Sequence, residues 1–350
     1  MTQNASVAVV VPVYNRRLKV VKTLESVSAQ TELPSLLVVV DDGSADGSAE
    51  AARTWLSRNA PFEWRVITQS NAGVSVARNT GFAHIGDLPY VCFLDSDDLW
   101  PRNFIAEALR AFEGRDDIVA AVADRIKETS GKRERARRFD SVSQNALLWL
   151  LFNGGAILSC TTIRSSAARL AGLFDPRMRV RQDLDFFLRL FLLGGAAHSK
   201  ADPVLCIKGA PLETTEPANN SAKSLKFKYE GALDLNSAVS KIPKDFYRKH
   251  ERSIRTALAR RWASVAHASK RLHNRRLAFN CLIQAVWWDY AWRRRLRLIW
   301  FFSQEKKSLA DFQSPFVEPP GPKQKVGFSS APSQQSPTCR RQAGAGKTRT

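Results

Sequence analysis

Residues 90–98 read Tyr-Val-Cys-Phe-Leu-Asp-Ser-Asp-Asp, a short apolar run that ends in three carboxylates. A continuous apolar run of this length, rich in aromatic and β-branched residues, predicts a strand that is buried on both faces. The carboxylates of Asp95, Asp97 and Asp98 would repel one another at the end of that strand unless a cation or a positive ligand neutralised them. The stretch therefore predicts a buried strand that leads into a charged site.

Two earlier runs have the same character, because residues 7–11 and 36–40 are apolar and the second ends at Asp41-Asp42. The segments between these runs and the run at 90–98 have apolar residues at helical spacing. They predict helices over 16–29, 48–57 and 74–83, with a further strand over 64–68. Strands that alternate with helices indicate a parallel sheet covered on both faces. Ligands bind such sheets at the carboxyl ends of the strands, where both acidic clusters fall.

Beyond residue 100 the pattern is less regular. We expect helices over 102–112 and 183–193, a charged loop over 132–138, a strand over 156–163 and helices over 252–273 and 277–302. The resulting division of the 350 residues is a catalytic α/β domain over 1–210, an irregular linker over 211–240, a basic helical region rich in Trp and Arg over 241–312, and a disordered tail over 313–350.

The positive charge of the chain is concentrated at its C-terminal end. The whole chain carries +20, and residues 241–350 alone hold 24 basic and six acidic residues, a net charge of +18. A nearly neutral body with a cationic end suggests a catalytic unit joined to an electrostatic attachment device.

The five cysteines are scattered, and the chain has no apolar run of about 18 residues that would span a membrane. An odd number of cysteines without C-x-x-C spacing argues against a disulfide framework or a structural zinc site. We therefore expect no signal peptide, no spanning helix and a cytoplasmic protein, with peripheral attachment to the inner face of the plasma membrane as an option.

The D-x-D spacing of Asp95 and Asp97 lets both carboxylates point to the same side of the strand end. Hard oxygen ligands of this kind suit Mg²⁺ or Mn²⁺ shared with substrate phosphates. The alternative is that Asp97 or Asp98 caps the helix that begins near Pro101.

Several motifs, taken in order, resemble the family 2 glycosyltransferases. They read VPVYNR at 11–16, VDDGS at 40–44, NAGVSVARNTG at 71–81, FLDSDD at 93–98, GLFD at 172–175 and QDLDFFLRL at 182–190. The resemblance covers about residues 5–200. It implies a GT-A fold, an α/β architecture with a central, mostly parallel sheet, and an inverting transfer from a nucleotide-diphosphate-sugar with a divalent metal, Mn²⁺ or Mg²⁺. The implied acceptor is a glycan or a lipid-linked molecule, as in cell-surface polysaccharide synthesis.

Carried over position by position, the resemblance assigns the nucleotide to residues at the strand ends: Pro12, Tyr14, Asn15, Asp41, Asp42, Asn71, Gly73, Arg78 and Asp95. Within this set, Asp41 and the 12–15 loop would hold the nucleobase and ribose, and Asp42 would support that loop. Asp97 would be the metal ligand, with Asp95 at the ribose or at the metal through water, and Asp98 a third candidate.

Asp183 stands at the position of the family's general base, a carboxylate that removes the proton of the attacking hydroxyl. The family usually has Glu-Asp at this point, and this chain has Gln182-Asp183. Asp185 is the second candidate, although it could instead pair with Arg189 one helical turn later. Near the late strand at 204–207, where the family often has an Arg or His for the diphosphate, the chain offers Lys208.

Residues 277–302 combine four tryptophans with four arginines. Such a helix could simply pack on the catalytic domain with its arginine heads in water. It could also lie in a membrane interface, with Trp at the headgroups and Arg near anionic lipid. A non-catalytic protein that binds sugar nucleotides, nucleic acid or membrane is the alternative function. We expect no nucleic-acid partner, because the acidic strand ends would repel phosphate backbones.

Overall fold

The structure is a computed structural model that describes residues 5–129, 132–135, 145–153, 158–178, 181–208 and 220–288. Within these ranges a seven-stranded sheet has the order β10-β6-β9-β4-β1-β2-β3. Its pairs are parallel except where β9 meets β4 and β6. The strands are β1 (Ala5–Val13), β2 (Pro34–Asp41), β3 (Glu63–Thr68), β4 (Tyr90–Phe93), β6 (Ile118–Val122), β9 (Thr161–Arg164) and β10 (Gly195–His198).

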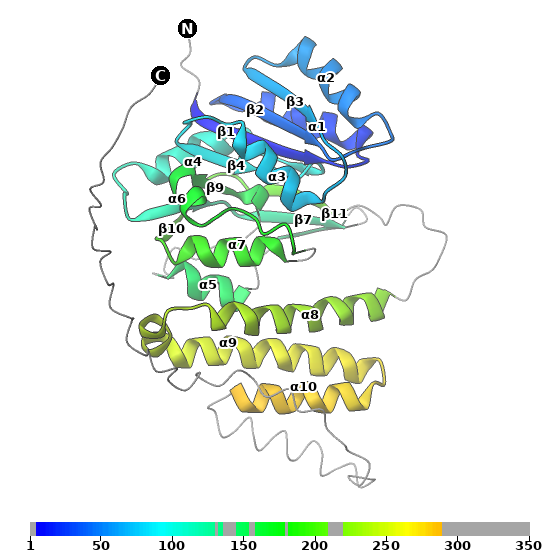
Figure 1. The fold of residues 1–350 in the computed structure, drawn as a ribbon, viewed down its shortest axis with the longest axis vertical. Helices are drawn as coiled ribbons and strands as arrows, with labels where there is room; N and C mark the ends of the chain where they lie inside the picture. Colours follow the sequence, from blue (N-terminus) through cyan, green and yellow to red (C-terminus); the bar gives the residue numbers. More distant parts are fainter. Residues whose placement is uncertain are drawn as a thin grey trace, which may run out of the picture. The chain divides into compact units, whose positions relative to one another are not determined.

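Both faces of this sheet are buried, and alternate residues of β1 show how. Val7, Val9 and Val11 pack in one cluster with α1 (Arg17–Ser28), α2 (Ser48–Asn59) and α4 (Phe104–Phe112). Ala8 and Val10 pack on the other side with α3 (Val74–Ala83), α5 (Ala146–Asn153), α6 (Ser165–Leu170) and α7 (Gln182–Phe191). A strand covered on both faces needs a continuous apolar run, which is what residues 7–11 supply. Figure 1 shows the sheet with its helices.

A second, four-stranded sheet among the described residues has the order β5-β11-β7-β8. Its strands are β5 (Asp98–Leu99), β7 (Arg125–Thr129), β8 (Lys132–Arg135) and β11 (Val204–Lys208). The prediction of a charged loop over 132–138 is wrong for residues 132–135, which form an edge strand. Opposite charges face each other across the β7–β8 pair, as in the 2.7 Å ion pair between Arg133 and Glu128, and such cross-strand pairs stabilise a hairpin.

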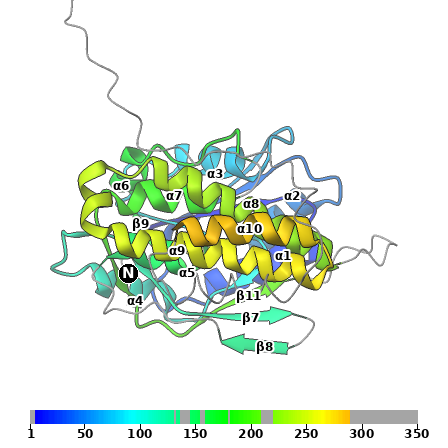
Figure 2. The same cartoon turned by 90° about the horizontal axis from the view of Figure 1, so that it is seen from below.

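Helices α8 (Asn220–Ser240), α9 (Lys244–Arg271) and α10 (Arg275–Trp288) follow the α/β part. Residues 220–240, which we expected within an irregular linker, are helical. Leu225, Ala232 and Leu235 recur at helical spacing and are buried in the same core cluster as α5 and α7. The α8–α9 contact is therefore continuous with the core of the α/β part. Figure 2 shows α9 and α10 side by side.

The structure confirms the predicted α/β class, with a central, mostly parallel sheet, helices on both faces and a helical region after it. The helix expected over 277–302 is described only as far as Trp288, and the expected tail over 313–350 lies outside the described residues. Among the helices that the structure describes, none is long and apolar enough to span a bilayer.

Candidate functional site

A pocket of about 520 Å³ lies at the carboxyl ends of the parallel strands. β1, β2 and β4 are parallel neighbours, so the loops after them meet at one edge of the sheet. The pocket is lined by Pro12, Val13, Tyr14, Asn15, Arg16, Asp42, Asn71, Gly73, Val74, Ala77, Arg78, Asp95, Ser96 and Asp97. Nearly all of the residues singled out from the sequence are thus brought together, although Asp41 and Asp183 are not among those that line it.

The loop after β1 is tied to the loop after β2 through Asn15. Its backbone N–H donates to Ser44 Oγ at 2.9 Å, and its side-chain oxygen accepts from the N–H of Ala45 at 2.9 Å. Asn15 has φ of 50°, a left-handed conformation that Asn tolerates better than most residues. The side chain of Tyr14 is half exposed at this loop. The two loops therefore form one connected wall of the pocket.

The two aspartates at the end of β2 have different surroundings. Asp42 accepts three hydrogen bonds, from Gln69 Nε2 (2.8 Å), the N–H of Ala72 (2.9 Å) and the N–H of Gly73 (2.8 Å). Asp41 is buried, and one of its oxygens accepts from the N–H of Ser44 at 2.8 Å. Asp42 thus supports the 69–73 loop as well as lining the pocket. Contact of Asp41 with a nucleoside stays a prediction.

Replacing Asp42 with Ala is expected to destabilise the fold by about 2 kcal/mol, because each buried donor left without a partner costs about 1–3 kcal/mol. The 69–73 loop would also lose its register against β2, so nucleotide affinity should fall. Denaturant unfolding and nucleotide titration measure the two effects. The exposed Asp87 provides the control, Asp87→Ala. Unfolding of Asp42→Ala at the denaturant midpoint of Asp87→Ala would contradict this role.

Arg78 is carried into the pocket by α3, which lies close against β1. A Cβ at Gly81 of α3 would overlap the side chain of Val10, so only glycine permits this approach. The Arg78 side chain is 5% exposed, its Nη2 lies 2.7 Å from Asp95 Oδ1, and its guanidinium lies 5.3 Å from the centre of the Phe174 ring. Among the described residues no acceptor reaches its Nε or Nη1. Arg78 therefore places a buried positive charge at the pocket wall, which favours an anionic ligand.

The carboxylates after β4 separate into two groups. The side chains of Asp95 and Asp97 are 39% and 25% exposed and line the pocket. Asp98 instead accepts from the N–H of Ile207 in the second sheet, and its pKa is raised to about 7, first by burial and then by the charge of Asp95. α4 begins at Phe104, so Asp98 does not cap it. Asp98 therefore belongs to the interior rather than to the pocket.

Asp97 fits a divalent cation better than any other carboxylate near the pocket. Burial, followed by the charge of Asp95, raises its pKa, while Arg16 and Lys19 act in the opposite direction. Both of those cations are 3.8 Å from Asp97 and remain only partly engaged. The described residues contain no group of three or more His, Cys, Asp or Glu placed to hold a metal. Asp95 and Asp97 could therefore hold Mg²⁺ or Mn²⁺ together with ligand phosphates and water, as these ions prefer.

Sequence reasoning gave no role to Arg16 or Lys19, although both lie beside Asp97. Their position in the sequence could have indicated this place, because Arg16 directly follows the 12–15 loop and Lys19 comes almost one helical turn later. Lys208, which the sequence offered for the diphosphate, has a side chain that lies outside the described residues.

Asp183 lies in the first turn of α7, where its Oδ1 accepts from the N–H of Leu184 at 2.8 Å. Burial raises its pKa, and the charge of Arg78 lowers it while that of Asp95 raises it. The N-cap of α7 is Arg181, so Asp183 is not the cap. A partly buried carboxylate with a raised pKa is a candidate proton acceptor.

Asp185 is held by two cations in the protein interior. It is buried, it accepts from Arg189 Nη2 at 2.8 Å, and Lys241 Nζ lies 2.6 Å from its other oxygen. Although burial acts to raise it, these hydrogen bonds hold the pKa of Asp185 below its usual value. Asp185 therefore joins α7 to the segment after α8, as an ion-paired residue of the interior.

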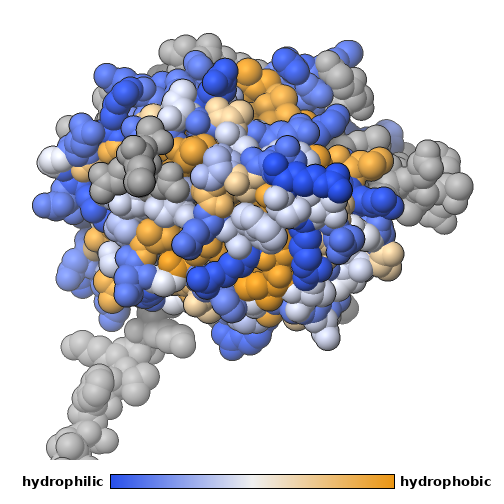
Figure 3. All heavy atoms as spheres, turned by 90° about the horizontal axis from the view of Figure 1, so that it is seen from above, coloured by the Kyte–Doolittle hydropathy of each residue, from blue (hydrophilic) through white to orange (hydrophobic). Residues whose placement is uncertain are grey.

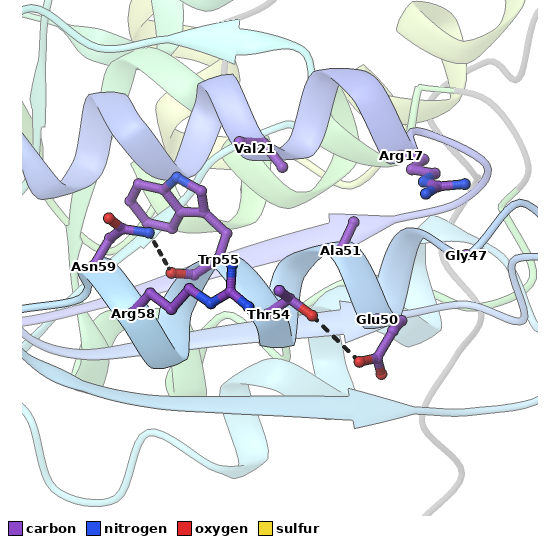
Figure 4. Close-up of a pocket in the computed structure, with 9 residues that line it drawn as sticks. All are labelled: Arg17, Val21, Gly47, Glu50, Ala51, Thr54, Trp55, Arg58 and Asn59. Atoms are coloured by element: carbon purple, nitrogen blue, oxygen red, sulfur yellow. Dashed lines mark hydrogen bonds between the residues drawn. The ribbon is translucent and has the colours of Figure 1, made fainter.

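A second hollow of about 540 Å³ lies between α1 and α2 (Figure 4). Trp55 and Asn59 lie at one end and Glu50 at the other, and the dashed lines mark hydrogen bonds within α2 itself. This groove contains none of the carboxylates at the strand ends.

Figure 3 shows the face seen from above, where apolar residues occur in small separate groups among hydrophilic ones. The described residues visible in this view form no extended apolar patch of the kind that marks a partner.

Residues 8–170 match the sequence profile of glycosyl transferase family 2. Three curated glycosyltransferases are 30%, 37% and 35% identical to the chain over 149, 133 and 113 residues, and the chain spans only 42%, 18% and 34% of their lengths. A longer match is to a putative teichuronic acid biosynthesis glycosyltransferase, TuaG of Bacillus subtilis. It is 25% identical over 229 residues, which are 63% of this chain and 83% of TuaG.

Two solved structures share the fold. The S. aureus TarS 1-349 structure in complex with UDP-GlcNAc has a TM-score of 0.53 at 14% identity, covering 86% of this chain and 93% of that one. The mannosyltransferase PcManGT from Pyrobaculum calidifontis, in complex with GDP-Man and Mn²⁺, has a TM-score of 0.57 at 18% identity, covering 87% and 81%. At these identities the likeness concerns the fold, and it confirms the predicted GT-A architecture.

Proposed function

We propose that this protein, whose residues 8–170 match glycosyl transferase family 2, transfers a sugar, with inversion, from a nucleotide-diphosphate-sugar to a hydroxyl of a glycan or lipid-linked acceptor. The observation that carries the proposal is the single pocket that joins Arg78, Asp95 and Asp97 to the loops after β1 and β2. Support for a nucleotide-sugar donor comes from TarS and PcManGT, whose structures contain UDP-GlcNAc and GDP-Man. TuaG, named for teichuronic acid biosynthesis, supports a role in polysaccharide synthesis.

The donor half of the reaction is assigned to the strand-end loops and to Arg78. Departure of a nucleoside diphosphate builds negative charge on its β-phosphate, and the positive charge of Arg78 at the pocket wall is suited to stabilising that charge. A divalent cation held by Asp97 and Asp95 would add Lewis-acid stabilisation of the same charge. The loops at 12–15 and 69–73, linked by the contacts of Asn15 and Asp42, would hold the nucleoside.

The acceptor half of the reaction is assigned to Asp183. A sugar hydroxyl is a poor nucleophile near neutral pH, and a positioned carboxylate can take its proton during attack. Because burial raises the pKa of Asp183, its carboxylate is a stronger base than an exposed aspartate. Attack by the deprotonating hydroxyl on the face opposite the leaving diphosphate inverts the anomeric carbon in a single displacement.

Thermal unfolding in the presence of UDP, GDP, CDP, ADP or dTDP, each with and without Mn²⁺, tests the proposal. A ligand at about 100 times its Kd adds about 2.7 kcal/mol to the free energy of unfolding, which is visible as a rise in Tm. We expect one nucleotide to raise Tm, and to do so more strongly with Mn²⁺. No rise with any of the five would contradict a nucleotide-sugar donor. An assay for release of that nucleotide from its sugar-linked form then distinguishes an enzyme from a non-catalytic binder.

Attachment to an anionic membrane through residues 277–302 stays a proposal, as does the location on the inner face of the plasma membrane. The described part of that segment ends at Trp288, where the exposed Trp287 and Ile283 lie on the same side of α10. Arg255 of α9 lies 5.4 Å from the centre of the Trp287 ring. This pairing of an exposed aromatic ring with a cation supports an interfacial role.

A further inference from the structure

Arg181 directly precedes the helix that carries Asp183, and it belongs to the protein interior. Its side chain is only 8% exposed. Its backbone has φ of 55°, an uncommon left-handed conformation for an arginine, and its carbonyl accepts the N–H of Asp185 at 3.2 Å. This conformation sets the direction in which α7 starts. It persists only if the surrounding structure holds the residue in place.

The residues that hold the Arg181 side chain come from α8, more than 45 residues later in the sequence. Asp234 Oδ2 lies 3.7 Å from Arg181 Nε. At Gly231 the guanidinium lies directly on the helix backbone, since a Cβ there would be 2.6 Å from Arg181 Nε and would overlap Nη2 and Cζ as well. Gly231 is buried, so the arginine has no solvent-filled space to move into.

α8 is itself firmly supported. Ala232, Leu235 and Val239 are buried in the core cluster shared with α7 and α9. Trp262 of α9 donates from Nε1 to the Asn236 side chain at 3.3 Å, and more of α9 packs along the same helix (Figure 1). The segment that follows α8 is tied back to α7 by the ion pair between Lys241 and Asp185. α8 therefore presents Gly231 and Asp234 to Arg181 from a fixed position.

We propose that α8 is a positioning element of the active site, in which Gly231 and Asp234 hold the Arg181 guanidinium and so fix the first turn of α7 and the carboxylate of Asp183. The inference rests on the proposed role of Asp183 as the base. Residues after the family 2 match, which ends at residue 170, then complete the catalytic site. Gly231 and Asp234 touch no reacting atom, and their effect passes through Arg181.

The charges around this contact favour the arrangement. Arg181 is one of the cations that act on Asp183, together with Arg78, while Asp95 acts in the opposite direction. On the side of the helical layer, Glu230 of α8 adds negative charge near Asp234. Arg261 of α9 also lies near Arg181, and the two positive charges repel each other, which lowers the pKa of Arg261. Asp234 thus offsets the charge of Arg181, which is why removing the charge of Asp234 should displace Arg181.

The test compares Asp234→Asn, Asp234→Glu and Gly231→Ala in the full chain, with Asp245→Asn as the matched control. Asp245 lies in the same helical layer and its side chain is 98% exposed. The probe is release of nucleoside diphosphate from a panel of UDP-, GDP-, CDP-, ADP- and dTDP-linked hexoses, with water as the acceptor. For each variant kcat, the KM for the donor and Tm are measured.

Asp234→Asn and Gly231→Ala are expected to lower kcat by about 10- to 100-fold, the effect of a misplacement of about 1 Å at a catalytic group. The donor KM should stay near that of the wild type, because the strand-end loops are untouched. Asp234→Glu, which keeps the charge, should recover most of the rate. A merely structural role would lower Tm without this separation of kcat from KM and without recovery by glutamate.

Values of kcat for Asp234→Asn and Gly231→Ala equal to that of Asp245→Asn would overturn the inference. So would equal losses in kcat and in donor affinity. These results differ from failure of the proposed function, in which Asp183→Asn would release nucleotide as fast as the wild type, or the wild type would release none from any donor. In either of those cases the inference falls together with the function on which it rests.

Discussion

Asp183→Asn is expected to lower the rate of sugar transfer by about 10²- to 10⁴-fold, the usual contribution of a general base. Asparagine has nearly the same shape and can still accept from the N–H of Leu184, so the first turn of α7 should be retained. It cannot take a proton from the acceptor hydroxyl. Nucleotide binding should stay close to that of the wild type, because Asp183 does not line the strand-end pocket.

Transfer kinetics and nucleotide titration measure these two effects separately. Asp202→Asn, at an exposed position, is the control for the chemical change itself. Weak nucleotide binding together with residual transfer in Asp183→Asn would reverse the assignment, since it would make Asp183 a donor ligand rather than a base.

The pH dependence of the wild type follows from the same carboxylate. A general base works in its deprotonated form, so the rate should fall as the pH is lowered through the pKa of Asp183. Burial raises that pKa from 3.8, so the loss of activity should begin at a higher pH than for an exposed aspartate. A pH–rate profile measures the position of this acidic limb. An acidic limb that persists unchanged in the residual activity of Asp183→Asn would assign it to another group.

Asp97→Ala is expected to abolish the dependence of nucleotide binding on the metal. In the wild type, burial and the charge of Asp95 raise the pKa of Asp97. The two carboxylates therefore repel each other, and a bound Mn²⁺ would neutralise their charge. Without Asp97, the carboxylates left at the pocket are Asp95, which is paired with Arg78, and Asp42, which is hydrogen-bonded to the 69–73 loop. Mn²⁺ should then no longer tighten the binding of the nucleotide.

Titration of the nucleotide identified by thermal unfolding, with and without Mn²⁺, measures this change without any need for turnover. Asp87→Ala should keep the wild-type response to Mn²⁺, because Asp87 is exposed and does not line the pocket. If Mn²⁺ still tightened binding in Asp97→Ala, the metal would have to be held elsewhere.

The sequence predicted the α/β core well because that core is made of local signals. The runs at 7–11, 36–40 and 90–94 are too apolar to be anything but buried, and each becomes a strand of the central sheet. The helix over 74–83 has the bounds expected from its spacing. Strand-end loops of parallel neighbours must meet, so the gathering of Tyr14, Asp42 and Asp97 followed from the order of the strands alone.

The elements that sequence reasoning misjudged lack the hydrophobic periodicity on which it relied. Residues 132–135 carry four charged side chains in a row, and they become a strand beside the neighbouring β7, which offers opposite charges at Glu128 and Lys127. Residues 220–240 have a weak helical pattern, and the helix packs with its apolar residues against α7 and α9. A charged strand and a weakly patterned helix are set by what they contact in the folded chain, so hydrophobic periodicity did not reveal them.

The sequence by itself determined the class of fold, the edge of the sheet that holds the site and the residue types available there. These follow from hydrophobic runs and from the chemistry of adjacent side chains, which are properties of short segments. Only the tertiary structure decided the surroundings of each carboxylate. Asp41 and Asp42, Asp97 and Asp98, and Asp183 and Asp185 are chemically equivalent near neighbours, and they differ by what packs against them. Burial and charge at each carboxylate come from elements far apart along the chain, and they exist only once the chain has folded.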